Sequence, residues 1–320
     1  MSIVDLALSS SNPILRCPSP AKLNLFLHIT GRREDGYHML QTAFQLLDYG
    51  DELSFKLRND KKIALTEQID GVSLQDNLVW RAATALRELA LSQGNKRICG
   101  VDIAIKKNLP LGAGLGGGSS NAATTLLALN SIWNCNFERS TLADLGVALG
   151  ADVPVFVYGH SAWAEGIGEK LQPLELPERW FVVVHPAVHI STVKLFSNSE
   201  LTRDCTPITI RGFRDGEPVS NVFEPIVCAQ QPAVQNALEM LAKLASENCV
   251  GTDCGASGPA MTGTGSCVFL ACESKQQAQN VQRELTDSMS AGEEVSVFIA
   301  KGVNHSPLNK VIETFRHCTI

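Results

Sequence analysis

The stretch of the chain with the clearest chemical signal is a glycine-rich segment between Pro110 and Ser120. Its glycines lack the Cβ atom that would keep a phosphate group away from backbone N–H groups. The segment precedes a predicted helix, whose start offers free N–H donors and the positive end of the helix dipole. Two serine hydroxyls at that start add donors, or ligands for a phosphate-bound cation. The sequence therefore predicts a phosphate-binding loop made of Pro110, Gly112, Gly114, Leu115, Gly116, Gly117, Gly118, Ser119 and Ser120.

Two other phosphate-binding motifs fit this segment less well. In the Walker pattern G-x-x-x-x-G-K-[ST], begun at Gly112, the place of the essential lysine is taken by Gly118. The dinucleotide pattern G-x-G-x-x-G fits formally, but it should open the first βαβ unit, with an acidic residue about 20 residues later. Here the segment lies far into the chain, and Glu138 falls at the end of a different segment. A nicotinamide-dependent oxidoreductase is therefore an alternative enzyme class that the pattern disfavours.

Three polar residues outside the loop could take part in phosphate transfer. Lys22 and Asn24 alternate with apolar residues, so they share one face of a predicted strand. Asp152 follows a predicted helix and precedes the apolar stretch 153–156. Taken alone, an aspartate in such a place is more often a cap or turn residue than a catalytic base. The residues by themselves leave both roles open for Asp152.

Helical and strand patterns alternate along both halves of the chain. Helices are predicted over residues 77–92, 121–133, 141–149, 232–247 and 275–287. Ser140 is the predicted N-cap of the helix at 141–149. Strands are predicted over residues 22–29, 101–107, 180–185, 267–272 and 295–301. The two halves do not resemble each other, and the texture changes near residues 155–170. These patterns predict an α+β protein of two domains.

The composition disfavours several functional classes. A net charge of −6 gives no general basic field, so we expect no nucleic-acid partner. The apolar runs are strand-length and residues 1–17 lack the features of a secretory signal, so we expect no membrane association. The ten cysteines form no C-x-x-C pair, which favours reduced cysteines that pack in a cytoplasmic protein, Cys254, Cys267 and Cys272 among them. We expect a monomer or a weak dimer.

Three segments resemble the motifs of the GHMP small-molecule kinases. They are residues 20–25 (PAKLNL), the glycine loop with the residues that follow it, and residues 261–266 (MTGTGS). Four more segments are similar to one branch of this family, which phosphorylates a cytidyl-diphosphate sugar alcohol in the non-mevalonate route to isoprenoids. They are residues 32–38 (RREDGYH), 150–156 (GADVPVF), 221–225 (NVFEP) and 301–307 (KGVNHSP). The resemblance covers nearly the whole chain.

The resemblance implies a fold and a reaction. The implied fold is the α+β GHMP kinase fold, with an ATP-binding domain over residues 1–162, a ferredoxin-like domain over residues 163–320 and the active site between them. The implied reaction is ATP-dependent phosphorylation of the 2-hydroxyl of the small-molecule substrate. Mg²⁺ should accompany ATP, with Ser119 and Ser120 both open as its protein ligand. A kinase for another acceptor, such as mevalonate or homoserine, is the alternative.

The resemblance also implies roles for residues near the phosphates. Asp152 would be the catalytic carboxylate that takes or orients the hydroxyl proton, with Lys22 beside it. Asn24 would position the diphosphate or the acceptor hydroxyl. Asn77 and Lys107 would bind the adenosine end of ATP, and Asn77 could also cap the helix that follows it.

A second group of residues would recognise the base of the substrate. Tyr37 and Phe196 would stack on the two faces of cytosine, and His38 would hydrogen-bond to its edge. The second domain would cover the substrate through Thr192, Gly263 and Thr264.

Overall fold

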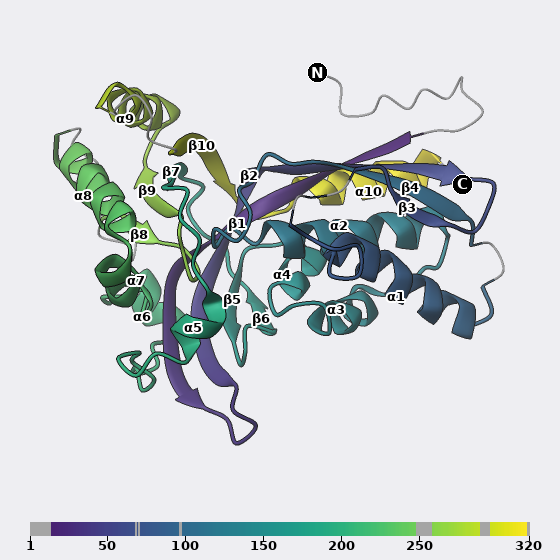
Figure 1. Cartoon of the computed structure of the whole chain (residues 1–320), viewed down its shortest axis with the longest axis horizontal. Helices are drawn as coiled ribbons and strands as arrows, with labels where there is room; N and C mark the ends of the chain where they lie inside the picture. The colour runs from purple at the N-terminus through teal and green to yellow at the C-terminus, as the bar shows by residue number, and fades with distance from the viewer. Residues whose placement is uncertain are drawn as a thin grey trace.

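Two long antiparallel strands run through both halves of the molecule (Figure 1). They are β1 (Ile14–Arg32) and β2 (His38–Arg58), joined by a turn at Gly36, whose φ of 90° favours glycine. The structure is a computed structural model of the 320-residue chain that describes residues 14–67, 69, 71–95, 98–247, 258–288 and 295–318. The two strands therefore connect the N-terminal half of the molecule to the C-terminal half.

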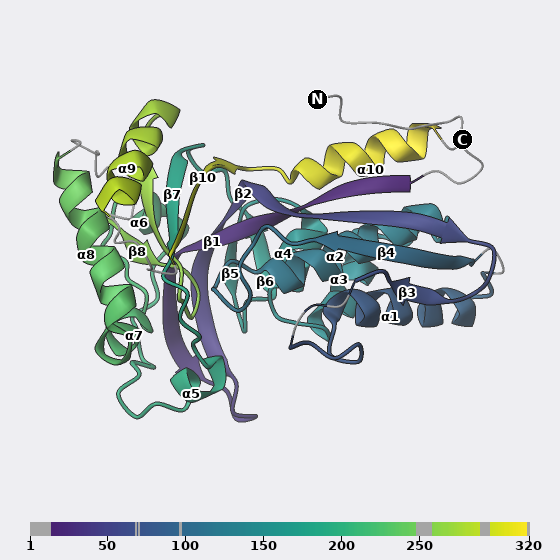
Figure 2. The same ribbon diagram turned by 45° about the horizontal axis from the view of Figure 1, so that its top comes forward.

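The N-terminal half is a sheet with helices packed on one face (Figure 2). The short strands β3 (Ile63–Leu65), β4 (Gly100–Lys106), β5 (Ala162–Glu165) and β6 (Lys170–Pro173) complete the sheet around β2. The helices on that face are α1 (Leu78–Ser92), α2 (Gly117–Ile132), α3 (Arg139–Val147) and α4 (Val153–Tyr158). Their apolar faces form the largest hydrophobic core with β2 and β4, and Trp133 is buried within it.

The C-terminal half has four antiparallel strands in the order β10-β7-β9-β8. These are β7 (Trp180–His185), β8 (Ala260–Met261), β9 (Val268–Cys272) and β10 (Ser296–Val303). The helices of this half are α5 (Thr192–Phe196), α6 (Ile210–Arg214), α7 (Glu224–Gln230), α8 (Pro232–Glu247) and α9 (Lys275–Ser288). Helices α7, α8 and α9 lie together on the outer side of this half (Figure 1).

The two halves share one ten-stranded sheet. The end of β10 pairs with the middle of β2, where Gly302 and Val303 face Leu47 and Leu46. The last helix, α10 (Pro307–Cys318), then returns to the N-terminal half and lies along β1 (Figure 2). The α+β architecture expected from the alternating patterns is confirmed.

Most predicted elements are found within two residues of their predicted bounds, but the strand predicted at 22–29 is the longer β1 (Ile14–Arg32), and β2 was not predicted. Helix α2 begins at Gly117, four residues before its predicted start, because the last two loop glycines already form its first turn. Ser140 does not cap α3, whose N-cap is Glu138. One register shift in the pairing of β1 with β2 lies within the strand predicted at 22–29, between Asn24 and Leu27. This shift interrupts the alternation of the two faces, and Phe26, Leu27 and His28 are all buried.

The cysteines that the structure describes are free thiols. Burial raises the pKa of Cys17 and Cys267, and it raises the pKa of Cys272 to about 12, so these thiols stay protonated and act as packing side chains. Cys249 and Cys254 lie outside the described residues. None of the helices in the described part of the chain is long and apolar enough to span a bilayer.

Candidate active site

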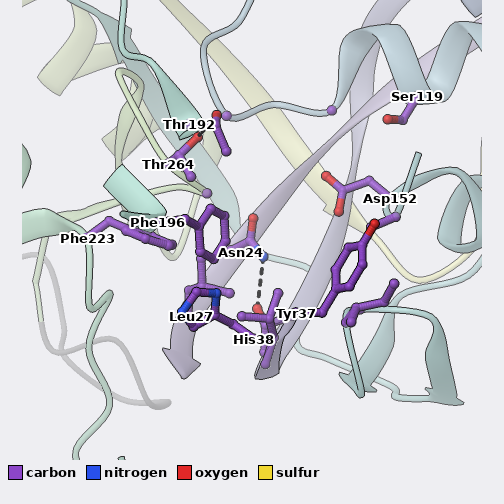
Figure 3. A pocket seen from close by; sticks show the side chains of 18 of the residues that line it. Asn24, Leu27, Tyr37, His38, Ser119, Asp152, Thr192, Phe196, Phe223 and Thr264 are labelled. Carbon is purple, nitrogen blue, oxygen red and sulfur yellow. Dashed lines mark hydrogen bonds between the residues drawn. The ribbon is translucent and has the colours of Figure 1, made fainter. Parts of the chain in front are cut away.

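A cavity of about 790 Å³ lies between the two halves. Its walls come from β1, β2, the glycine loop, the turn before α4, helix α5 and the loop after β8 (Figure 3). Twelve residues predicted as site residues line it: Lys22, Asn24, Tyr37, His38, Gly114, Gly116, Ser119, Asp152, Thr192, Phe196, Gly263 and Thr264. The phosphate motif and the base-binding motif, which are separate in the sequence, therefore open into one space.

Lys22 lies at the centre of the polar end of this cavity. Its side chain is almost fully buried, and its Nζ donates to Asn24 Oδ1 at 2.5 Å and to the carbonyl oxygen of Gly114 at 2.8 Å. Asp152 Oδ2 lies 3.3 Å from the same Nζ. These acceptors offset the cost of burying the ammonium group and hold it in one position.

Asp152 precedes helix α4, yet its side chain forms no capping hydrogen bond. The side chain is 34 % exposed and lines the cavity. The carboxylate is thus close to one buried cation and open to a ligand on its other side. This arrangement fits a general base better than a structural cap.

The glycine loop is shaped by close backbone approaches. Gly116 is the left-handed N-cap of α2, with φ of 71°, and a Cβ atom there would lie 2.9 Å from the ring of Phe156. A Cβ atom on Gly114 would lie 2.2 Å from the carbonyl oxygen of Thr262, in the loop after β8. Glycine is needed at both positions, and the close contact at Gly114 joins the phosphate loop to the C-terminal half.

The first turn of α2 places Ser119 and Ser120, the two candidate metal ligands, in different surroundings. Ser119 lines the cavity, whereas Ser120 is fully buried and its Oγ accepts a hydrogen bond from Ser19 Oγ at 2.8 Å. A metal ligand from this pair would therefore be Ser119. The described residues hold no cluster of three or more histidine, cysteine or acidic side chains that could bind a metal ion by themselves.

The other predicted phosphate-loop and adenosine residues lie outside the cavity lining. Asn77 Oδ1 accepts from Val79 N at 2.9 Å and caps α1, and Lys107 is paired with the buried carboxylate of Asp51. Lys107 Nζ is nevertheless 3.5 Å from the point where a Cβ on Gly117 would lie, so it adjoins the start of α2. The remaining predicted residues outside the lining are Pro110, Gly112, Leu115, Gly117, Gly118 and Ser120.

Aromatic side chains form the other end of the cavity. The rings of His38 and Phe196 lie 5.1 Å apart with their planes inclined by 30°, and Phe196 packs edge-on against Phe223 at 4.9 Å. Tyr37 is 60 % exposed, and Figure 3 shows it across the cavity from Phe196. An exposed aromatic side chain that lines the cavity is available to stack on a flat ligand.

The loop after β8 closes the cavity from the C-terminal half. Thr264 Oγ1 lies 3.1 Å from Thr192 Oγ1 of α5, which joins two walls of the cavity. Asn221 donates to the carbonyl oxygens of Met261 and Gly263, both at 2.8 Å, and so fixes the path of this loop.

Sequence reasoning missed several cavity residues. Thr42 and Phe44 come from β2, where the strand register places Phe44 opposite Asn24. Phe223 stands in the segment NVFEP, whose motif was noticed without a role for the ring. Arg203 lies outside the cavity lining and was also missed, although its guanidinium donates to His38. No local pattern marks Arg203, because the contact joins positions that are distant in the sequence.

Comparisons with known proteins show the family of this chain. A profile for the GHMP kinases N terminal domain matches residues 77–160, and one for the GHMP kinases C terminal domain matches residues 216–291. A relative from Marinobacter nauticus, named 4-diphosphocytidyl-2-C-methyl-D-erythritol kinase, is 50 % identical over 92 % of this chain and 96 % of its own. One of the same name from Nitrosococcus oceani is 49 % identical over 94 % and 99 %.

Solved structures show the same likeness. A crystal structure of 4-(cytidine 5'-diphospho)-2C-methyl-D-erythritol kinase has a TM-score of 0.72 and 30 % identity, covering 90 % of this chain and 100 % of that chain. A homoserine kinase from Cytophaga hutchinsonii has a TM-score of 0.60 at 18 % identity, covering 96 % of this chain and 97 % of that chain, which shows a shared fold.

Proposed function

The chain belongs to the GHMP kinases, and we propose that it transfers the γ-phosphoryl group of ATP to the 2-hydroxyl of 4-diphosphocytidyl-2-C-methyl-D-erythritol. This is a step of the non-mevalonate route to isoprenoid precursors. One observation carries the proposal: the Lys22–Asp152 pair and the aromatic group of Tyr37, His38 and Phe196 line one cavity. A nucleoside diphosphate could bridge these two ends.

In the proposed reaction, the oxygen of the 2-hydroxyl attacks the γ-phosphorus of ATP, and the bond from that phosphorus to the bridging oxygen of ADP breaks. Asp152 takes the hydroxyl proton as the new phosphate ester forms. The Nζ of Lys22 lies 3.3 Å from this carboxylate and offsets negative charge on the transferred group. Asn24, which is hydrogen-bonded to Lys22, positions the acceptor hydroxyl or the diphosphate.

The glycine loop holds the phosphates of ATP through the free N–H groups at the start of α2. Mg²⁺ fits this site, because kinases hold it mainly by phosphate oxygens, and Ser119 at the cavity wall would supply a hydroxyl ligand. When bound, the ion would neutralise charge on the phosphate oxygens. Asn77 and Lys107, which lie outside the cavity lining, would bind the adenosine end of ATP.

The aromatic end of the cavity determines which substrate accepts the phosphate. Tyr37 and Phe196 stack on the two faces of cytosine, and His38 reads its edge. Thr192, Gly263 and Thr264 cover the substrate from the C-terminal half. A mevalonate or homoserine kinase would not need this aromatic group, and the likeness to a homoserine kinase structure extends to the fold alone.

We also propose an N-terminal domain of residues 1–162 and a C-terminal domain of residues 163–320 as a division of the sequence, although β6 and α10 of the second segment pack with the N-terminal half. The expected cytoplasmic location, the monomeric or weakly dimeric state and the lack of nucleic-acid and membrane partners stay predictions from the sequence.

The test is phosphate transfer from ATP to the cytidyl-diphosphate substrate, followed by mass measurement of the product. The expected product carries one added phosphate at the 2-position, and the reaction should be slowed by free cytidine nucleotides that compete for the base end. Transfer to mevalonate or homoserine with no effect of cytidine nucleotides would reject the proposal in favour of a sister kinase.

A further inference from the structure

Arg203 joins the two protein segments that form the base end of the cavity. It is a half-buried residue in the segment that follows α5. Its guanidinium donates to the carbonyl oxygens of Leu201 at 2.9 Å, Phe196 at 3.0 Å and Asn198 at 2.7 Å. The Nε of the same group donates to His38 Nε2 at 3.2 Å. One side chain thus holds both Phe196 and His38.

The contact with Arg203 determines which nitrogen of the His38 ring carries the proton. A guanidinium group has five donors and no acceptor, so His38 Nε2 must be the acceptor in this bond. Burial, together with the positive charges of Arg203 and Arg32, lowers the pKa of His38 and favours the neutral ring. In a neutral ring whose Nε2 accepts, the proton is on Nδ1. Within the described part of the chain, no group hydrogen-bonds to Nδ1.

We propose that Arg203 is a specificity-positioning residue, which holds His38 in the Nδ1–H tautomer so that the ring donates to N3 of the substrate's cytosine. N3 is an acceptor in cytosine but carries a hydrogen in uracil, so a uracil base would place two donors against each other. The inference rests on the proposed function, because it needs a pyrimidine at this end of the cavity. It explains how the site would distinguish cytosine from uracil.

The geometry of arginine is needed for this role. The planar guanidinium reaches three carbonyl oxygens and the imidazole at once, whereas a lysine ammonium has three donors on one atom and no fixed plane. Arg203→Lys should therefore keep the positive charge but no longer hold the His38 ring in one orientation. Arg203→Met removes both and leaves His38 free to adopt either tautomer.

The kinetic test compares the cytidyl substrate with its uridyl analogue. The parent enzyme should prefer cytosine in kcat/KM, and Arg203→Met should reduce that preference by about tenfold, since a fixed hydrogen bond is lost. Most of the change should come from slower use of the cytidyl substrate, and KM for ATP should not change. The matched control is Arg211→Met, because Arg211 is exposed on α6 and outside the cavity lining.

A second measurement identifies the tautomer of His38 and does not depend on enzyme activity. Nitrogen NMR of the His38 ring in the free protein should report Nδ1–H in the parent and a mixture of tautomers in Arg203→Met, even where that variant is less stable. An Nε2–H ring in the parent, or equal losses on both pyrimidine substrates, would overturn the inference. Absence of any transfer to the cytidyl substrate by the parent enzyme would instead overturn the proposed function.

Discussion

Lys22 and Asp152 differ in their exposure, and the difference supports the roles proposed for them. The ammonium group of Lys22 is buried among three oxygen acceptors, so it is fixed before any substrate arrives. The carboxylate of Asp152 is a third exposed and has no capping hydrogen bond. A fixed cation beside an accessible carboxylate can lower the barrier without rearrangement at the moment of transfer.

Asp152→Asn should keep the fold and ATP binding while phosphate transfer falls by about 10²–10⁴-fold. The amide keeps the shape of the side chain but cannot accept the hydroxyl proton. Single-turnover transfer, measured beside a thermal melt, checks this. Asp144→Asn is the matched control, since Asp144 is exposed on α3. Activity of Asp152→Asn within a few-fold of the parent would remove Asp152 from the catalytic role.

Tyr37 should act through the face of its ring. Its side chain is exposed in the free protein, so Tyr37→Ala should leave stability unchanged and weaken binding of the cytidyl substrate by about 1–3 kcal/mol. Tyr37→Phe should lose much less, because the stacking face survives. The measurement is KM for the cytidyl substrate with KM for ATP as the internal control. Equal losses for both variants would assign the effect to the hydroxyl.

At the scale of the elements, the start of α2 is fixed from behind by a buried polar network. Both oxygens of Asp51 are used: Oδ1 accepts from the backbone N–H groups of Asn108 and Leu109 at 2.8 and 2.9 Å, and Oδ2 accepts from Asn121 Nδ2 at 2.9 Å. Lys107 completes the set as an ion pair. The residues flanking the glycine loop on both sides therefore share one carboxylate.

Asp51→Asn should loosen this anchor. The amide replaces an acceptor with a donor that faces other donors, so unfolding free energy should fall by about 1–3 kcal/mol. KM for ATP should rise more than KM for the cytidyl substrate, because the glycine loop shifts and the base end does not. Urea unfolding and steady-state kinetics check the two effects. Asp215→Asn, in an exposed ion pair on the surface, is the matched control.

Local patterns predicted the elements well where one physical signal was sufficient. Strand 180–185 and helix 232–247 are found at their predicted bounds, because each has a continuous apolar run or a clear helical period. The start of α2 was missed because helix propensity counts Gly117 and Gly118 as breakers, while a phosphate loop places glycine in the first turn. The irregularities of β1 were missed because pairing register depends on the partner strand.

At the scale of the whole molecule, the cavity is produced by long-range contacts. Its walls meet because β1 and β2 run through both halves and because Gly114 packs against the carbonyl oxygen of Thr262. The motifs predicted residues that line this cavity, Lys22 and Asp152 among them, yet neither spacing nor composition could indicate that Arg203 reaches His38. Such contacts form only when distant segments fold together.

The titration of four histidines predicts how the stability of the whole molecule depends on pH. Burial lowers the pKa of His28, His38, His160 and His185 below the ordinary value of 6.5. Below about pH 6.5 the unfolded chain therefore binds protons that the folded chain does not, so unfolding free energy should fall as pH falls. Burial raises the pKa of Glu224, which works in the opposite direction but is one group against four.

Urea unfolding at about pH 7.5 and about pH 5.5 should show the protein less stable at the lower value, because proton uptake by the unfolded chain dominates there. His185→Gln should reduce this difference, since its ring lies at the end of β7 and its titration is removed. The four contributions act through one folding equilibrium, so the loss should be gradual and reversible on return to the higher pH. Stability that is unchanged or greater at the lower pH would contradict the expected sign, and it would mean that these rings accept protons in the folded state as readily as in the unfolded chain.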